Sequence, residues 1–136
     1  MQLSRKADYA LRAVAYVAQL KKGELASIGR IAKSRGIPRE FLAKILKELT
    51  RAGLLVSFQG VTGGYRLARP AKEISFLEVI EAMEGPVAVN LCVDGGHCDC
   101  TREKGCEIRP FFVKQQEQIH KALKKQTFGS LNSGRQ

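Results

Sequence analysis

Two short amphipathic segments joined by a glycine–proline turn constrain the fold of this chain more than any other feature. The first segment begins at Ser27, a residue type that caps helices, and places Ile28 and Ile31 on one face. Gly36 and Pro38 then make the turn, because glycine ends helices and proline suits the first position of the next one. The following segment carries an apolar stripe at Phe41, Leu42, Ile45, Leu46 and Leu49. This pattern predicts a helix-turn-helix.

A glycine-rich hairpin is predicted directly after the second of these helices. Residues 54–59 and 65–68 have the composition of strands, and residues 60–64 supply the turn between them. A hairpin in this position is typical of the wing in a winged helix-turn-helix. Its glycines would let the backbone approach a phosphate or the minor groove closely. The alternative is a hairpin that only stabilises the fold.

Further helical patterns flank this core. Ser4 can cap a helix that ends near residues 21–23, and Ser75 with Glu78 has the spacing of a capping box that opens a short helix. A long polar helix is expected over residues 107–126, with an apolar seam that it cannot bury alone. The seam consists of Ile108, Phe111, Phe112, Ile119, Ala122 and Leu123.

The seam predicts pairing with the same helix of a second copy, whereas packing back on its own domain is the alternative. We therefore expect a mainly α fold with a small β-hairpin wing, and a winged helix-turn-helix followed by a long C-terminal dimerisation helix. The expected boundaries are residues 1–85 for the DNA-binding domain, 86–106 for a cysteine-bearing loop, 107–126 for the dimerisation helix and 127–136 for a flexible tail.

The positive charge lies entirely in the first half of the chain. Residues 1–70 carry 14 basic and 4 acidic side chains, a net charge of +10, whereas residues 71–136 carry 9 of each. Such an asymmetry indicates a half that binds a polyanion and a neutral half with another role, although a basic surface alone can also serve solubility.

We predict double-stranded DNA as the polyanion, bound as a palindromic operator by a two-fold homodimer. The expected DNA-binding residues lie on the two helices and the hairpin: Ser27, Arg39, Glu40, Ala43, Lys44, Lys47, Gln59, Gly60, Thr62, Gly63 and Tyr65. Lysine can reach guanine or phosphate, and glutamine can pair with adenine.

All four cysteines lie within a stretch of fifteen residues, at Cys92, Cys98, Cys100 and Cys106. Structural zinc sites favour pairs of cysteines separated by two to four residues, and this stretch has no such pair. An iron–sulfur cluster tolerates longer spacings, and a thiol redox switch is a third possibility. A disulfide framework does not suit a reduced cytosol. From the spacing alone, the cluster, zinc and the thiol switch stay open, with the cluster favoured.

These parts together resemble the Rrf-type family of bacterial winged-helix regulators, whose members include IscR, NsrR, RirA and CymR. The resemblance covers about residues 1–130 and rests on residues 3–12, Gly53-Leu54, residues 63–70 and the cysteine segment. It implies a homodimer with crossing C-terminal helices and a cluster held by three loop cysteines. It also implies that loss of the cluster changes DNA affinity, so that the protein reports iron–sulfur, nitric oxide or redox status.

The resemblance implies ligands at Cys92, Cys98 and Cys106, with Cys100 as the alternative middle ligand. We expect a 2Fe–2S rather than a 4Fe–4S cluster. Some family members use a histidine three residues after the last cysteine, but Arg109 stands there. Others use an aspartate in the first helix of the partner chain, where Asp8 stands in this sequence.

Asp8 and His97 are thus the candidates for a fourth ligand. A purely structural role for Asp8 is the competing interpretation, since an acid in the first turn of a helix is favoured by the helix dipole and can pair with Arg12. The operator also need not match that of IscR, since Ala43, Lys44 and Gln59 differ from the residues IscR has at these places.

We predict a cluster-sensing transcription regulator, in particular a repressor. The alternative is a cluster-free regulator of the same fold that responds to thiol oxidation or to a protein partner. An enzyme is not expected, because His97 and His120 are the only histidines and neither accompanies a nucleophile in a catalytic pattern. No apolar run approaches the length of a membrane span and no signal peptide is recognisable, so we expect a cytoplasmic protein.

Overall fold

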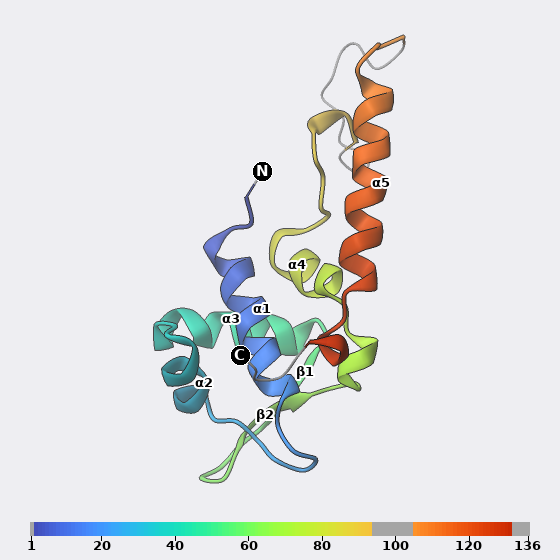
Figure 1. Ribbon diagram of the computed structural model, residues 1–136. Helices are drawn as coiled ribbons and strands as arrows, with labels where there is room; N and C mark the ends of the chain where they lie inside the picture. Colours follow the sequence, from blue (N-terminus) through green and yellow to red (C-terminus); the bar gives the residue numbers. More distant parts are fainter. Residues whose placement is uncertain (1, 94–104, 132–136) are drawn as a thin grey trace.

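The computed structural model describes residues 2–93 and 105–131 (Figure 1). Its elements are α1 (Arg5–Ala18), α2 (Ile28–Arg35), α3 (Arg39–Arg51), β1 (Leu55–Phe58), β2 (Gly64–Leu67), α4 (Phe76–Glu84) and α5 (Arg109–Lys125). Short 3₁₀ turns lie at Ala71–Glu73, Leu91–Val93 and Phe128–Ser130. The helices α1–α4 and the hairpin form one unit, and α5 stands beside it and extends well beyond it (Figure 1).

Local capping explains where the predicted helices begin. The hydroxyls of Ser4 and Ser27 each accept a hydrogen bond from the backbone N–H three residues later, at 3.1 and 3.2 Å. Ser75 and Glu78 form the predicted capping box, with both side-chain to backbone distances at 3.2 Å. Gly36 ends α2 with a φ of 63°, a left-handed conformation that glycine adopts without strain. The helix-turn-helix predicted from the sequence is therefore confirmed.

α1 ends earlier than its sequence suggests. We expected it to run to residues 21–23, but the helix stops at Ala18 and the next two N–H groups bond to carbonyls three residues back, at 3.1 and 3.2 Å. Gly23 adopts a φ of 85° further along, in the loop that leads to α2. The loop after α1 is therefore longer than predicted, and it projects on the same side of the molecule as the wing (Figure 1).

The hairpin pairs β1 with β2 in antiparallel register, with Leu55 opposite Leu67 and Phe58 opposite Gly64. The backbone of Ala26 pairs with Tyr65 through two hydrogen bonds of 2.8 and 3.0 Å, which fixes the hairpin beside the start of α2. Gly64 is required by close approach, because a Cβ there would lie 2.6 Å from the Ala26 carbonyl oxygen. The wing is thus attached to the helix-turn-helix through its backbone.

One apolar core holds these elements together. α1, α3 and α4 pack against one another, and β1 covers one end of α3. The ten largest of the side chains that are essentially inaccessible to solvent are Val14, Ile31, Leu42, Ile45, Leu46, Leu49, Leu55, Ile74, Val79 and Ile80. The apolar face that the sequence assigned to the second helix of the pair is therefore the face buried in the core, which leaves the opposite, charged face in solvent.

The segment after α5 corrects one expectation. We predicted a flexible tail over residues 127–136, but Phe128 is 4% exposed and its ring lies 4.8 Å from that of Phe76. Backbone bonds of 2.9 Å from Phe76 N–H to Gln126 and 3.1 Å from Phe128 N–H to Ile74 complete the contact. Residues up to Leu131 therefore bind back onto the winged unit, because an aromatic side chain finds a buried site there. In the part of the chain described, no helix is long and apolar enough to cross a membrane.

Candidate DNA interface and cysteine segment

The outer face of α3 presents the predicted recognition residues to solvent. Arg39, Glu40, Ala43, Lys44 and Lys47 are all exposed, while the opposite face of the helix is buried. Within the described residues none of these side chains takes part in an ion pair. The helix is thus anchored by its apolar stripe and keeps a basic surface available for a polyanion.

The wing and the start of α2 meet in a second part of this surface. A hollow of about 240 Å³ is lined by Ser27 and Ile28 of α2 and by residues of the hairpin. It gathers five of the predicted DNA-binding residues: Ser27, Gln59, Gly60, Gly63 and Tyr65. Gly63 is needed for the tight tip, because a Cβ there would overlap the carbonyl of Phe58. Thr62 is exposed at the tip without lining the hollow.

Ser27 already has a structural partner. Its hydroxyl accepts the N–H of Arg30 and so caps α2, which leaves its O–H hydrogen and one acceptor lone pair for another contact. Arg30 itself is fixed on the surface by the Leu25 carbonyl at 3.0 Å and by Glu24 at 3.4 Å. Hydrogen bonding to Tyr16 raises the pKa of Arg30, a group that is a cation at physiological pH even at its ordinary value.

The two cysteines that the structure describes lie at either end of the cysteine segment. Cys92 is 8% exposed and its Sγ lies 3.6 Å from Asn90 Nδ2, whereas Cys106 is half-buried close to the start of α5. Cys98, Cys100 and His97 fall outside the described residues. Among the residues that are described, no three candidate metal ligands are gathered.

Asp8, the other candidate ligand, is paired on the surface of α1. Its Oδ2 lies 2.8 Å from Arg12 Nε, and both side chains are about half exposed. The hydrogen bond and charge of Asp8 raise the pKa of Arg12. This contact matches the structural role that the sequence allowed for Asp8, since an i,i+4 pair of this kind stabilises a helix by about 0.3–0.5 kcal/mol.

A side-chain clamp that the sequence did not indicate ties the segment before Cys92 to α5. Gln116 accepts the N–H of Val89 at 2.8 Å, and its amide nitrogen donates to the carbonyl of Val87. His120 Nε2 lies 2.7 Å from the same carbonyl. The same ring nitrogen lies 3.0 Å from Gln116 Nε2, so it donates to the Val87 carbonyl in the tautomer with the hydrogen on Nε2 and accepts from Gln116 in the other.

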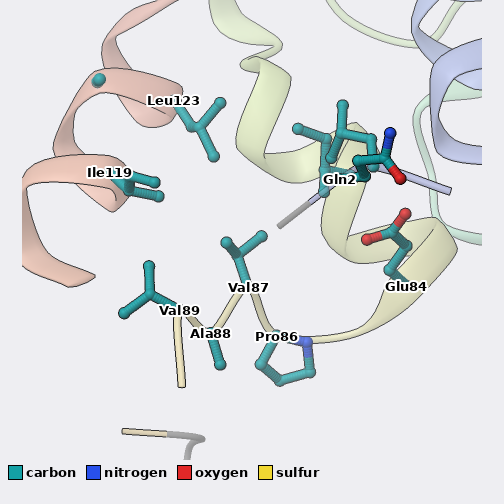
Figure 2. A pocket seen from close by; sticks show the side chains of 11 residues that line it. Gln2, Glu84, Pro86, Val87, Ala88, Val89, Ile119 and Leu123 are labelled. Atoms are coloured by element: carbon teal, nitrogen blue, oxygen red, sulfur yellow. The ribbon is translucent and has the colours of Figure 1, made fainter. Parts of the chain in front are cut away.

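The exposed apolar side chains of α5 and of Ile108, the residue just before it, follow the predicted seam in part. Ile108 and Phe111 are 61% and 60% exposed, and Ile119 is 38% exposed. The lower part of the seam borders a groove of about 570 Å³ between α5, α4 and the residues before α1 (Figure 2). Val87, Ile119 and Leu123 all line it. The seam is therefore only partly covered by its own chain.

These observations define the architecture of the protein: a winged helix-turn-helix with a basic outer face on α3 and a hairpin wing beside α2. Comparison with known proteins agrees. The family described as "Iron-dependent Transcriptional regulator", Rrf2, matches residues 3–133. The chain belongs to the Rrf2 family, which confirms the resemblance, the fold class and the expectation that the protein is a regulator and not an enzyme.

Individual relatives extend over nearly the whole chain. "Protein aau3" of Rhizobium meliloti is 35% identical over 136 residues, covering 99% of this chain and 87% of its own. The "HTH-type transcriptional regulator NsrR" of Oceanobacillus iheyensis is 34% identical, covering 96% and 89%. The solved structure of CymR, "the Global Cysteine Regulator of B. subtilis", has a TM-score of 0.85 at 21% identity and covers 100% of this chain and 99% of its own. This last likeness concerns the fold.

Proposed function

We propose that this protein is a homodimeric, sequence-specific repressor in the bacterial cytoplasm that senses iron–sulfur, redox or nitric oxide status through a cysteine-ligated cluster. The observation that carries the proposal is the position of Cys92. Its thiol is buried at the end of a segment that hydrogen bonds hold against α5. Cys92 thus links the cysteine-rich loop to the helix with the exposed seam. The family description as iron-dependent supports a metal at this loop.

The residues present fit such a cluster. Four thiols within fifteen residues are soft ligands suited to iron–sulfur chemistry, and burial of Cys92 would shield a bound cluster from water. We assign Cys92, Cys98 and Cys106 as ligands, with Cys100 as the alternative to Cys98. The bound group, which we propose to be 2Fe–2S, would supply redox and nitric oxide sensitivity.

Either Asp8 of the partner subunit or His97 completes the proposed ligand set. For Asp8 this requires the carboxylate to leave Arg12, a surface pair that is weak enough to exchange. Substituting Asp8 by Asn should then change the visible spectrum of the protein while leaving its stability within about 0.5 kcal/mol. An unchanged spectrum would leave His97 as the fourth ligand.

A second copy of the chain is proposed to cover the seam of α5. Ile108, Phe111 and Ile119 lie along one side of the helix and are too exposed to be stabilised by their own chain. The adjoining groove, which Leu3 and Leu123 also line, continues this apolar surface (Figure 2). A two-fold dimer formed here would present two α3 helices to the two halves of a palindromic operator.

The clamp provides a route from the cysteines to the DNA-binding surface. A change in the cysteine loop moves the segment that ends at Cys92, and Gln116 and His120 pass that movement to α5 through Val87 and Val89. Since α5 also binds the winged unit through Phe128, the spacing of the two recognition helices would follow.

Anaerobic reconstitution with iron and sulfide tests the cluster. The protein should become brown, with sulfur-to-iron charge-transfer bands, and substituting Cys92 or Cys106 by Ser should abolish the colour. Of the Cys98→Ser and Cys100→Ser variants, the one that loses colour identifies the middle ligand. A colourless protein with stoichiometric zinc would overturn the proposal. Reversible loss of two thiols on mild oxidation, without iron, would favour the thiol switch instead.

A further inference from the structure

A basic hollow beside the wing lies outside the surface discussed so far. Its volume is about 490 Å³, and it lies between the loop after α1 and the strand β2 with the turn that follows it. Four basic side chains line it: Lys21, Lys22, Arg66 and Arg69. The sequence-based selection of DNA-binding residues included none of them.

The charges in this hollow are unequally compensated. Arg69 is neutralised, because it lies 3.1 and 3.2 Å from the two carboxylate oxygens of Glu78. Glu24, the acid that lines the hollow, is bound by Arg30 and accepts the N–H of Lys21 at 3.0 Å. By contrast, Lys21, Lys22 and Arg66 are exposed, and among the described residues their side chains form no ion pair.

Arg66 is held in place for a contact with an anion. The hairpin register puts it opposite Val56, on the same face as Phe58, and its guanidinium lies 5.1 Å from the centre of the Phe58 ring. Stacking on an aromatic ring orients a guanidinium while its N–H groups stay free for hydrogen bonds. Phe58 is 42% exposed, so it serves this contact at the surface and not the core.

The position of the hollow points to DNA as its ligand. β2 carries Arg66 next to Tyr65, which lines the hollow between the wing and α2. The loop with Lys21 and Lys22 projects on the same side as the wing (Figure 1). A duplex bound by the wing would continue past these side chains, and lysine and arginine are the residues that bind its phosphates.

We propose that Lys21, Lys22 and Arg66 form a phosphate-binding site beside the wing, which holds the DNA backbone outside the bases that α3 and the wing reach. The site adds affinity that is independent of sequence and sensitive to salt. It rests on DNA binding by the winged unit but not on the cluster, the operator or the dimer.

The salt dependence of binding to a random-sequence 40-bp duplex tests this site, because the probe needs no known operator. Each phosphate contact contributes about 0.9 to the slope of log affinity against log salt. The full-length variant Lys21→Gln/Lys22→Gln/Arg66→Gln should therefore lose about 1–3 units of slope per protomer relative to the wild type. Thermal melting checks that both proteins are folded.

A matched control separates this site from net charge. The variant Lys114→Gln/Lys121→Gln/Lys124→Gln removes the same charge from exposed positions of α5 and should keep the wild-type slope. The proposal would be overturned if both variants lost the same amount of slope. It would also be overturned if the wild type and both variants had equal slopes, and that result would point to an acidic protein as the partner of the hollow. The slope measurement does not depend on the cluster proposal, because the cluster is tested separately by the colour of the reconstituted protein.

Discussion

Replacing Gln116 by Leu tests whether the clamp joins the cysteine segment to α5. Leucine keeps most of the side-chain volume but removes the hydrogen bond from Val89 N–H, at 2.8 Å, and the one to the Val87 carbonyl. His120 Nε2 lies 2.7 Å from that carbonyl and can still donate to it, so among the described residues Val89 N–H is the group left without a partner. Two neutral hydrogen bonds contribute together about 1–3 kcal/mol, which corresponds to a roughly 5- to 150-fold change in local opening.

Amide hydrogen exchange of Val89 measures this directly, because Gln116 is the one partner of its N–H among the residues that the structure describes. We expect its protection to fall by about one order of magnitude or more in the variant. Gln118→Leu is the matched control, since this glutamine lies on the same helix and is exposed. Unchanged protection of Val89 in Gln116→Leu, or equal losses in both variants, would refute the clamp.

Four further predictions follow from the described contacts. Phe128→Ala should destabilise the protein by about 3–5 kcal/mol in urea unfolding, because it empties a buried site, and a loss below 1 kcal/mol would restore the flexible tail. Phe111→Ala, at a side chain 60% exposed, should leave monomer stability nearly unchanged but weaken the dimer in sedimentation experiments, and an unaffected dimer would place the interface elsewhere. Lys44→Ala should weaken binding to a selected operator by about 1–3 kcal/mol if it reads a base, whereas an equal loss on random DNA would show a phosphate contact. The hydrogen bond from the backbone N–H of Lys21 lowers the pKa of Glu24 in the folded protein. This contact therefore stabilises the fold at pH values above the ordinary glutamate pKa, and that stabilisation is lost as the pH falls through the lower folded pKa. An NMR titration that gives Glu24 an ordinary glutamate pKa would contradict this prediction.

Features set by neighbouring residues could be predicted from the sequence. The caps at Ser4, Ser27 and Ser75 and the turn at Gly36 depend on contacts within a few positions, and all four are present in the structure. The buried stripe of α3 follows from helical periodicity in the same way. The charged outer face of α3 was therefore predictable as well, because it consists of the positions of the helix that lie opposite the buried stripe.

Contacts between distant segments were not predictable in this way. Phe128 lies in a polar stretch that looks like a tail, and only its buried contact with Phe76, far earlier in the chain, fixes it. In the sequence, Gln116 is one of many polar residues of a polar helix, and only the fold brings it beside Val87. Arg66 could have been found, because strand alternation places it on the face of Phe58, away from the core.

The affinity of cluster-loaded and cluster-free protein for one selected operator, measured anaerobically at a single salt concentration, tests the central claim most directly. Coupling through Cys92, the clamp and α5 should make the two affinities differ by about 5- to 150-fold, in line with coupling free energies of about 1–3 kcal/mol. The Gln116→Leu variant should reduce that difference. Equal affinities of the two forms for the operator would contradict the proposal that the cysteine segment controls DNA binding.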